Sequence, residues 1–361
     1  MPSLERSRRD ALRQVLVDRE LSAALISNLV NIRYLSGFTG SNGALLVGTD
    51  GGDQLATDGR YTDQVAAQVP DVSVTITTNP AVDALASLAA ERSLPTLALE
   101  THDLTADARD KITAAVHGTM TVSLGRVVEE LRVVKDESEI EALRSACQIS
   151  VQALEELQQG KFVGRTEQQI ARDLEWRMFA LGAEALAFET IVAAGPNSAI
   201  PHHEPTGREV ATGDLLKIDF GARFAGYHAD CTRTMMIHDQ PADWQREIYE
   251  LVASAQQAGR QALAPGAERI EVDRAARSVI DAAGFGDYFV HGLGHGVGLQ
   301  IHEDPYFSPR STGKLLSRTP VTVEPGVYLP DRGGVRIEDT LVVADSPELL
   351  TTTTRELLVV G

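Results

Sequence analysis

The feature that most constrains this chain is a set of acidic residues inside segments that otherwise predict buried strands. Asp219 lies in the apolar stretch Leu215–Gly221, and Asp230 lies in the next predicted strand, Tyr227–Thr232. An unpaired carboxylate in a protein interior costs several kcal/mol. Each of these acids therefore needs a cation, a cluster of hydrogen-bond donors or a metal ion close by.

A predicted hairpin brings these two acids together. Residues that face each other across an antiparallel hairpin are equally far from the centre of its turn. A turn centred between Phe224 and Ala225 would place Asp219 opposite Asp230. Facing like charges repel unless something positive lies between them.

A second predicted hairpin repeats the arrangement near the C-terminus. Glu324 and Glu338 each follow an apolar strand-like segment, and a turn centred on Asp331 would place them opposite each other. Between the two hairpins lies the segment His291–Gly298, in which every second residue is glycine. Alternating glycine lets another backbone or a ligand approach closely, and His295 lies in the middle of this segment.

Four carboxylates and one imidazole can hold two divalent cations. A ligand set dominated by oxygen, with one nitrogen, favours Mn²⁺, with Co²⁺, Fe²⁺ and Zn²⁺ as alternatives. A single acid in a strand is more often part of a salt bridge, and a single histidine is more often packed or hydrogen-bonded. The two facing pairs together with His295 favour a metal site over these simpler interpretations.

The hydrophobic pattern predicts two domains. Residues 1–125 alternate strand-like and helix-like segments, which indicates a small α/β domain. In residues 126–361, two helices followed by strands occur twice, so we expect an internal duplication. The first of these helices begins with Asp136 and Glu139 in a capping-box arrangement. Short turns join most strands, so we expect a largely antiparallel sheet with helices on one face, an α+β fold.

Composition excludes some classes of function. The chain has 33 Lys+Arg against 51 Asp+Glu and a formal net charge of −18, which argues against nucleic acid or an anionic membrane as partner. Because no apolar run reaches about 18 residues, no membrane span is expected. Cys147 and Cys231 are far apart in the sequence, and we expect buried thiols in a cytoplasmic protein.

The chain also resembles a known family. The motifs that carry the resemblance occur in the family's order and are Asp219-Phe-Gly, Asp230-Cys-Thr-Arg-Thr, His291-Gly-Leu-Gly-His295, Val-Glu324-Pro-Gly and Arg336-Ile-Glu338-Asp. They resemble, over about residues 136–345, the metallopeptidases with the pita-bread fold, which include Xaa-Pro aminopeptidases, Xaa-Pro dipeptidases (prolidases) and methionine aminopeptidases. Segments 31–41 and 57–61 resemble the creatinase-type N-terminal domain of the proline-specific members. Methionine aminopeptidases usually lack this domain, and creatinase lacks the metal ligands.

The resemblance implies roles for individual residues. Asp219, Asp230, His295, Glu324 and Glu338 would bind two divalent metal ions, with Asp230 and Glu338 bridging them. Glu324 would also act as acid and base while a water molecule activated by the metals attacks the scissile carbonyl.

Four residues outside the ligand set also match family positions. His202 matches a histidine that contacts the substrate and the reaction centre, whereas by itself it would be a turn residue after Pro201. His291 and His302 match histidines that line the proline pocket and stabilise the intermediate. Arg336 lies on the same strand face as Glu338 and could pair with carboxylates of the site or bind a substrate carboxylate. His203 is given no role.

The resemblance therefore implies a metal-dependent exopeptidase that cleaves between an N-terminal residue and proline in short peptides. An Xaa-Pro aminopeptidase is preferred and an Xaa-Pro dipeptidase is the alternative. A non-catalytic binding protein and a metal-free creatinase-like hydrolase are less favoured, because all five ligands are present. In relatives the N-terminal domain mediates dimer contacts, so a homodimer is expected.

Overall fold

The computed structural model describes residues 3–361 and contains two compact units, Met1–Arg132 and Val133–Gly361. No helix among residues 3–361 combines the length and the apolar character that a bilayer crossing requires.

Unit 1 contains a mixed six-stranded sheet in the order β4-β3-β2-β1-β5-β6. Strands β2 and β3 form a hairpin, with Ala44 paired to Ala56. Side chains from β1, β2, β5, α4 and α5 form the core of this unit. The helices are α1 (Leu4–Asp18), α2 (Leu29–Ser36), α3 (Thr62–Gln68), α4 (Ala81–Glu91), α5 (Ala106–Ala115) and α6 (Val127–Arg132), and the strands are β1 (Ala23–Ile26), β2 (Ala44–Gly48), β3 (Gln54–Thr57), β4 (Ser73–Ile76), β5 (Thr96–Leu99) and β6 (Met120–Ser123).

The first half of unit 2 begins with the helix that the capping pattern predicts. The side chain of Asp136 accepts from the backbone N–H of Glu139, and the side chain of Glu139 accepts from the N–H of Asp136. This half packs helices α7 (Glu137–Gln158) and α8 (Glu167–Ala180) on strands β7 (Ala185–Leu186), β8 (Ile191–Ala194), β9 (Leu215–Phe220), β10 (Ala222–Phe224), β11 (Tyr227–His228) and β12 (Cys231–Ile237). Its core includes Leu154, Met178 and Ile218.

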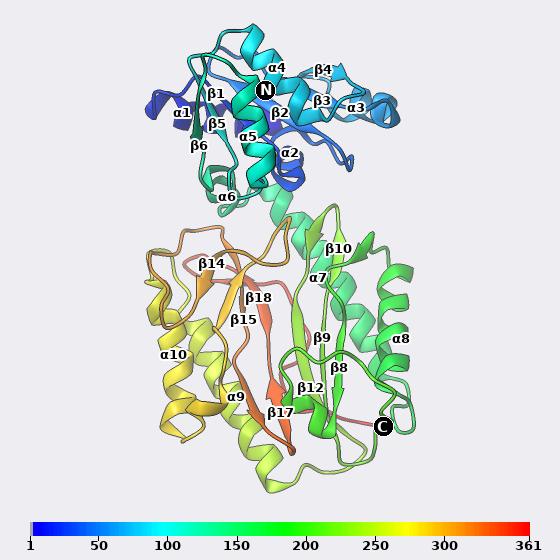
Figure 1. Ribbon diagram of the computed structural model, residues 1–361. Coiled ribbons are helices and arrows are strands. Elements are labelled where there is room, and N and C mark those ends of the chain that lie inside the picture. Colours follow the sequence, from blue (N-terminus) through cyan, green and yellow to red (C-terminus); the bar gives the residue numbers. More distant parts are fainter. Residues whose placement is uncertain (1–2) are drawn as a thin grey trace. The chain divides into compact units, whose positions relative to one another are not determined.

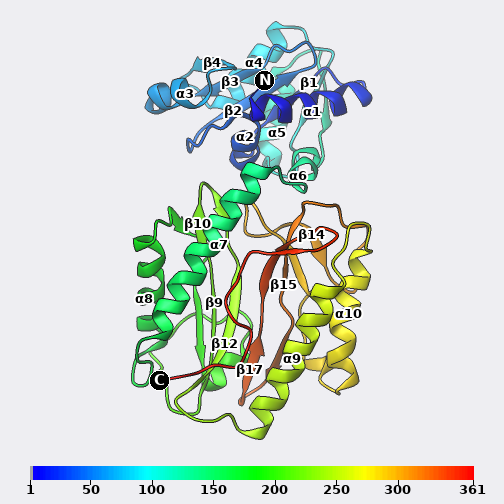
Figure 2. The ribbon, with the colours of Figure 1, turned by 180° about the vertical axis from the view of Figure 1, so that it is seen from behind.

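The second half of unit 2 repeats the order. Helices α9 (Asp243–Gln261) and α10 (Arg269–Ala282) precede strands β13 (Gly294–Gly296), β14 (Glu303–Phe307), β15 (Pro320–Val323), β16 (Gly326–Leu329), β17 (Gly333–Arg336), β18 (Asp339–Val342), β19 (Glu348–Leu349) and β20 (Val359–Val360). Within unit 2, α7 and α9 lie behind the strands in Figure 1 and in front of them in Figure 2, so both cover the same face. Except for β12 with β20, the strand pairs of this unit are antiparallel. The predicted α+β architecture with an internal duplication is confirmed.

The first predicted hairpin has a different turn. Phe224 pairs with Tyr227, so the turn consists of Ala225 and Gly226, and its centre lies one residue beyond the predicted position. Both residues have positive φ, 48° and 82°. Two-residue turns of this kind match the twist of the flanking strands, which is why the hairpin closes here.

The shifted turn changes which residue faces Asp219. Asp219 pairs with Thr232, not with Asp230, so the prediction of directly facing acids is wrong for this hairpin. Asp230 lies two residues before Thr232, and side chains two residues apart share one face of a strand. The two acids are therefore diagonal neighbours on the same face.

The second hairpin has the predicted register. Val327 pairs with Val335 in the β16–β17 ladder, and Val323 pairs with Asp339 in the β15–β18 ladder. Both pairings are centred on Asp331, which has a φ of 61°. Glu324 and Glu338 occupy equivalent positions where the two ladders meet.

Alternating glycine in the segment around His295 allows neighbouring strands to approach closely. A Cβ atom on Gly294 would lie 2.1 Å from the carbonyl oxygen of Thr322, and one on Gly296 would lie 2.3 Å from that of Asp304. Any side chain at either position would force the backbones of β13, β14 and β15 apart. The glycines thereby let β13, which carries His295, lie close to β14 and β15.

Candidate metal centre and active site

The centre of the site is a buried group of three side chains, Asp230, His295 and Glu338. Their ligand atoms all lie within 4.8 Å of one another, and the residues are only 5%, 6% and 1% exposed. Nδ1 of His295 lies 3.0 Å from the carbonyl oxygen of Gly296, so the ring is oriented with Nε2 toward the acids. A backbone hydrogen bond of this kind is the usual way to orient a metal-binding imidazole.

Glu324 and Asp219 complete the predicted set. Oε1 of Glu324 lies 3.5 Å from Nε2 of His295, and Oδ2 of Asp230 lies 3.4 Å from the same nitrogen. Asp219 lines the same cavity as the other four residues. All five predicted ligands therefore meet in one place. Asp219 lies in β9 and His295 in β13, whereas the other three lie in the short segments between strands.

Burial changes the acid–base properties of this cluster. Burial raises the pKa of Asp230 to about 6 and that of Glu324 to about 7. Burial and the charges of Asp230 and Glu324 raise the pKa of Glu338 well above its usual value. For His295, burial acts to lower the pKa, but the hydrogen bond to Asp230 and the charges of Glu324 and Asp230 raise it to about 9. The metal-free cluster therefore holds protons near neutral pH.

These residues fit divalent metal ions. Oδ1 of Asp219 is buried and has no hydrogen-bond partner among the described residues, although an orphaned buried carboxylate oxygen costs free energy. Four carboxylates and one imidazole are a ligand set suited to such cations. A cation at the cluster would satisfy this oxygen and replace the protons that the acids otherwise need.

Arg336 is the buried cation that the protein itself supplies. Its Nε donates to Oγ1 of Thr232 at 3.0 Å, and its Nη1 donates to the carbonyl oxygen of Pro201 at 3.1 Å and to the hydroxyl of Tyr328 at 2.9 Å. Its Nη2 donates to Oδ2 of Asp219. Four of its five N–H groups are thus committed, and the residue is 2% exposed. In this structure its role is structural pairing, and contact with a substrate carboxylate stays a prediction.

The three outer histidines line the cavity of about 680 Å³ that opens over the cluster. His202 is exposed within it. Nε2 of His291 lies 2.9 Å from the hydroxyl of Tyr328, and the ring of His302 packs edge-on against that of His295 with centroids 4.4 Å apart. Burial lowers the pKa of His291 to about 3 and that of His302 to about 4, so both rings are neutral at physiological pH.

The structure also shows supporting residues that the sequence analysis did not name. Thr232 donates its hydroxyl to Oε2 of Glu338 at 2.7 Å, and Tyr328 links Arg336 to His291. Thr232 lies two residues after Asp230, so strand periodicity would have placed it on the same face. No sequence signal connects Tyr328 to His291, because their contact joins β16 to the segment before β13.

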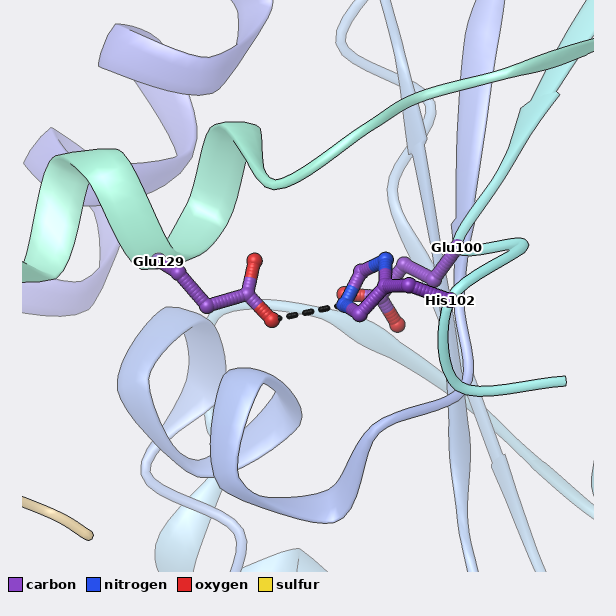
Figure 3. Close-up of side chains that lie close together, drawn as sticks. All are labelled: Glu100, His102 and Glu129. Atoms are coloured by element: carbon purple, nitrogen blue, oxygen red, sulfur yellow. Dashed lines mark hydrogen bonds and ion pairs between the residues drawn. The ribbon is translucent and has the colours of Figure 1, made fainter. Parts of the chain in front are cut away.

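A second group of possible ligands lies in unit 1 (Figure 3) and consists of Glu100, His102 and Glu129. His102 Nε2 lies 2.8 Å from Oε1 of Glu129. The amide nitrogen of Asn31 donates to Glu100 at 2.6 Å and to Glu129 at 3.0 Å. Glu100 also accepts from the backbone N–H groups of Ser27 and Asn28. Because N–H donors occupy the space between the two carboxylates, this group is a hydrogen-bond network that ties α2 and α6 to β5.

Comparison with known proteins shows two matching family models. Residues 141–345 match metallopeptidase family M24, and residues 8–134 match the creatinase/prolidase N-terminal domain. A curated relative, the Xaa-Pro dipeptidase of Pyrococcus furiosus, is 43% identical over 237 residues, which cover 64% of this chain and 67% of the relative.

Solved structures match over almost the whole chain. An Xaa-Pro dipeptidase from Bacillus anthracis is 34% identical with a TM-score of 0.95, covering 99% of this chain and 100% of the other. An X-Pro aminopeptidase from Thermotoga maritima is 36% identical with a TM-score of 0.88, covering 94% of this chain and 98% of the other. These neighbours confirm the expected pita-bread fold.

The first prediction concerns the two acids assigned to bridge the metals. Replacing Asp230 or Glu338 by alanine should remove bound metal and nearly all peptidase activity, because each is assigned to bridge the two ions. Elemental analysis of the purified variants should show this loss of metal. Full metal occupancy with near-normal kcat in either variant would contradict the assignment.

The second prediction concerns pH. Because the metal-free cluster holds protons with pKa values of about 6, 7 and 9 on Asp230, Glu324 and His295, a metal ion must displace them. Metal affinity should therefore rise as pH increases from about 5.5 to about 9. Calorimetry in two buffers of different ionisation enthalpy should detect released protons. An affinity independent of pH would show that the ligands are already deprotonated.

Proposed function

The chain belongs to metallopeptidase family M24, and from that premise we propose that it is a proline-specific exopeptidase. It hydrolyses the peptide bond between an N-terminal residue and a following proline in short peptides. The observation that carries the proposal is the buried cluster of four carboxylates and one imidazole at the floor of a peptide-sized cavity. The names of the relatives, Xaa-Pro dipeptidase and X-Pro aminopeptidase, support the same reaction.

We assign two divalent ions to Asp219, Asp230, His295, Glu324 and Glu338, with Mn²⁺ favoured by the predominance of oxygen. When bound, such ions polarise a carbonyl group and lower the pKa of a water molecule toward neutrality. The residues around them then have to orient the peptide and transfer protons.

Glu324 is the ligand best placed for proton transfer. Its side chain is 18% exposed, whereas Glu338 is 1% exposed and already accepts a hydrogen bond from Thr232. A substrate in the cavity can therefore reach the carboxylate of Glu324. His202 faces the same cavity from the opposite half of unit 2 and is assigned to hold the substrate carbonyl by donating a hydrogen bond.

The proline side of the cavity is lined by neutral rings. His291 and His302 carry no charge at neutral pH, since burial holds their pKa values at about 3 and 4. Ile301 and Phe307 line the cavity as well. A pyrrolidine ring is apolar and its amide has no N–H to be satisfied, so it suits a pocket lined by uncharged and apolar rings.

Charge favours an aminopeptidase over a dipeptidase. An Xaa-Pro dipeptide carries a carboxylate on its proline, which must find a cation. Among the described residues that line the cavity, Arg336 is the one arginine, no lysine is present, and four of its N–H groups are committed. Glu189 and Glu204 line the same cavity and are exposed, so they would repel a carboxylate. A dipeptidase is the second candidate, favoured by the name of the Bacillus anthracis neighbour.

We further propose that the enzyme is a cytoplasmic homodimer whose unit 1 limits substrates to short peptides. Both cysteines are free and buried, as in reducing compartments. Light scattering of the full chain should give twice the 38.9 kDa mass of one chain. A monomer that cleaves long peptides as fast as tripeptides would overturn both parts of this proposal.

A matched pair of peptides tests the substrate assignment. The purified, Mn²⁺-loaded enzyme should cleave a tripeptide Xaa-Pro-Yaa at least about tenfold faster than the dipeptide Xaa-Pro. The carboxylate of the dipeptide would enter a cavity whose arginine already uses four of its N–H groups in other hydrogen bonds. The tripeptide Xaa-Ala-Yaa is the control for proline. Preference for the dipeptide would show that the enzyme is an Xaa-Pro dipeptidase. Equal cleavage of the alanine peptide would show that the enzyme is not specific for proline.

Two histidine variants separate binding of metal from catalysis. His202→Ala should keep its metal and lose kcat by roughly 10²–10⁴-fold, the usual contribution of a group that assists proton transfer or holds the reacting carbonyl. His295→Ala should lose metal, because it removes the one nitrogen ligand. Elemental analysis with kinetics distinguishes these cases. The reverse pattern would show that the two roles have been exchanged.

A further inference from the structure

We propose that Lys217, which is neither a metal ligand nor a residue of the cavity wall, is a positioning residue that holds His202 at the reaction centre. This inference rests on the role that the proposed function gives to His202. Lys217 lies in the middle of β9, two residues before Asp219, and is 0% exposed.

The ammonium group of Lys217 donates to one short stretch of backbone. Its Nζ lies 2.6 Å from the carbonyl oxygen of Ile200, 3.1 Å from that of Ser198 and 3.4 Å from that of Pro201. A lysine ammonium has three N–H donors, and here three acceptors come from the segment 198–201. His202 is the next residue along the chain. The position of its backbone is therefore set directly by the lysine.

The contacts of Lys217 indicate no role for this buried side chain other than holding the segment 198–201. No carboxylate oxygen among the described residues forms an ion pair with its Nζ, and its further contact is the ring of Tyr328, 5.0 Å away. Burying a charged group is costly unless its donors are used. An apolar side chain would pack in this strand with less cost, but it would remove the donor to the carbonyl groups of Ser198 and Ile200.

A second buried charge fixes the chain on the other side of His202. Oε2 of Glu167 accepts from Nε2 of His203 at 2.8 Å, and from the backbone N–H and the hydroxyl of Thr206 at 2.9 Å and 2.6 Å. Glu167 is 0% exposed. Both histidines line the cavity, but His203 is buried by this contact whereas His202 is exposed. Lys217 and Glu167 fix the chain before and after His202.

The second half of unit 2 also contributes to this arrangement. Nη1 of Arg336 donates to the carbonyl oxygen of Pro201 at 3.1 Å, and the N–H of Gly334 donates to Oγ of Ser198 at 2.8 Å. Lys217 therefore holds a segment that strand β17 contacts from the other side. Losing the lysine should let this segment move relative to the metal ligands without removing any of them.

A double-mutant cycle tests the inference on the full-length, metal-loaded enzyme. Lys217→Met keeps the length of the side chain and removes its donors. We expect kcat for a tripeptide Xaa-Pro-Yaa to fall by on the order of 10²-fold, the effect of misplacing a catalytic group by about 1 Å, with metal content unchanged. In the His202→Ala background the same change should alter kcat by less than about twofold, because the group that Lys217 positions is gone.

An equal loss of kcat in both backgrounds would overturn the inference, as would normal kcat in Lys217→Met or loss of metal in step with activity. Arg144→Met is the matched control, because Arg144 forms its ion pairs with Glu137, Glu141 and Glu348 outside the cavity wall. It should leave kcat and metal content at the values of the unaltered protein. Glu167→Gln tests the same idea from the other anchor and should show the same dependence on His202, which decides the matter if Lys217→Met does not fold.

A structural measurement separates this inference from the proposed function. The imidazole signals of His202 can be assigned in NMR spectra by their absence from His202→Ala. They should shift or broaden in Lys217→Met and stay unchanged in Arg144→Met, whatever peptide the enzyme cleaves. An unchanged His202 signal would overturn the inference alone, whereas wild-type kcat in His202→Ala would overturn the proposed role of His202 alone.

Discussion

The mutual repulsion of four buried carboxylates is the constraint on which the rest of unit 2 depends. Asp219, Asp230, Glu324 and Glu338 share one low-dielectric space with the guanidinium of Arg336 and the imidazole of His295. Burial raises the pKa values of Asp230, Glu324 and Glu338, and repulsion by the neighbouring carboxylates raises them further, so without more positive charge these acids hold protons. Divalent cations resolve the same repulsion and give the protein its chemistry.

The internal duplication supplies these groups from two directions. The first half contributes Asp219 from β9 and Asp230 from just before β12, and the second half contributes His295, Glu324 and Glu338. Arg336 joins the two, because its guanidinium contacts Asp219 and Thr232 of the first half while its own strand leads to Glu338. A site shared in this way forms only when both halves are packed, so stability and activity depend on the same contacts.

Local signals in the sequence predicted much of this arrangement. The capping pair of Asp136 and Glu139 correctly marked the start of α7, and the turn centred on Asp331 correctly set the second hairpin. The centre of the first turn lies one residue beyond its predicted position because the turn depends on Ala225 adopting a positive φ, which alanine seldom does. The acid pairs and His295 indicated a metal site, whereas the bridging roles of Asp230 and Glu338 rested on the resemblance.

Other features depend on contacts between distant segments and could not be predicted. The partners of Arg336 come from β9, β12, β16 and the loop before β9, and no local pattern joins them. Lys217 is a different case. Burying a lysine in an apolar strand costs as much free energy as burying an aspartate. Its position in the sequence therefore already indicated that Lys217 needs specific partners, just as Asp219 does.

The most direct test of the account is anomalous diffraction from crystals of the protein grown with Mn²⁺. The account predicts two anomalous peaks per chain, each about 2.0–2.6 Å from its ligand atoms, with oxygens of Asp230 and Glu338 touching both. Nε2 of His295 should contact one of the two ions. A single peak, or peaks away from these side chains, would contradict the claim that the buried carboxylates exist to hold a dinuclear metal centre.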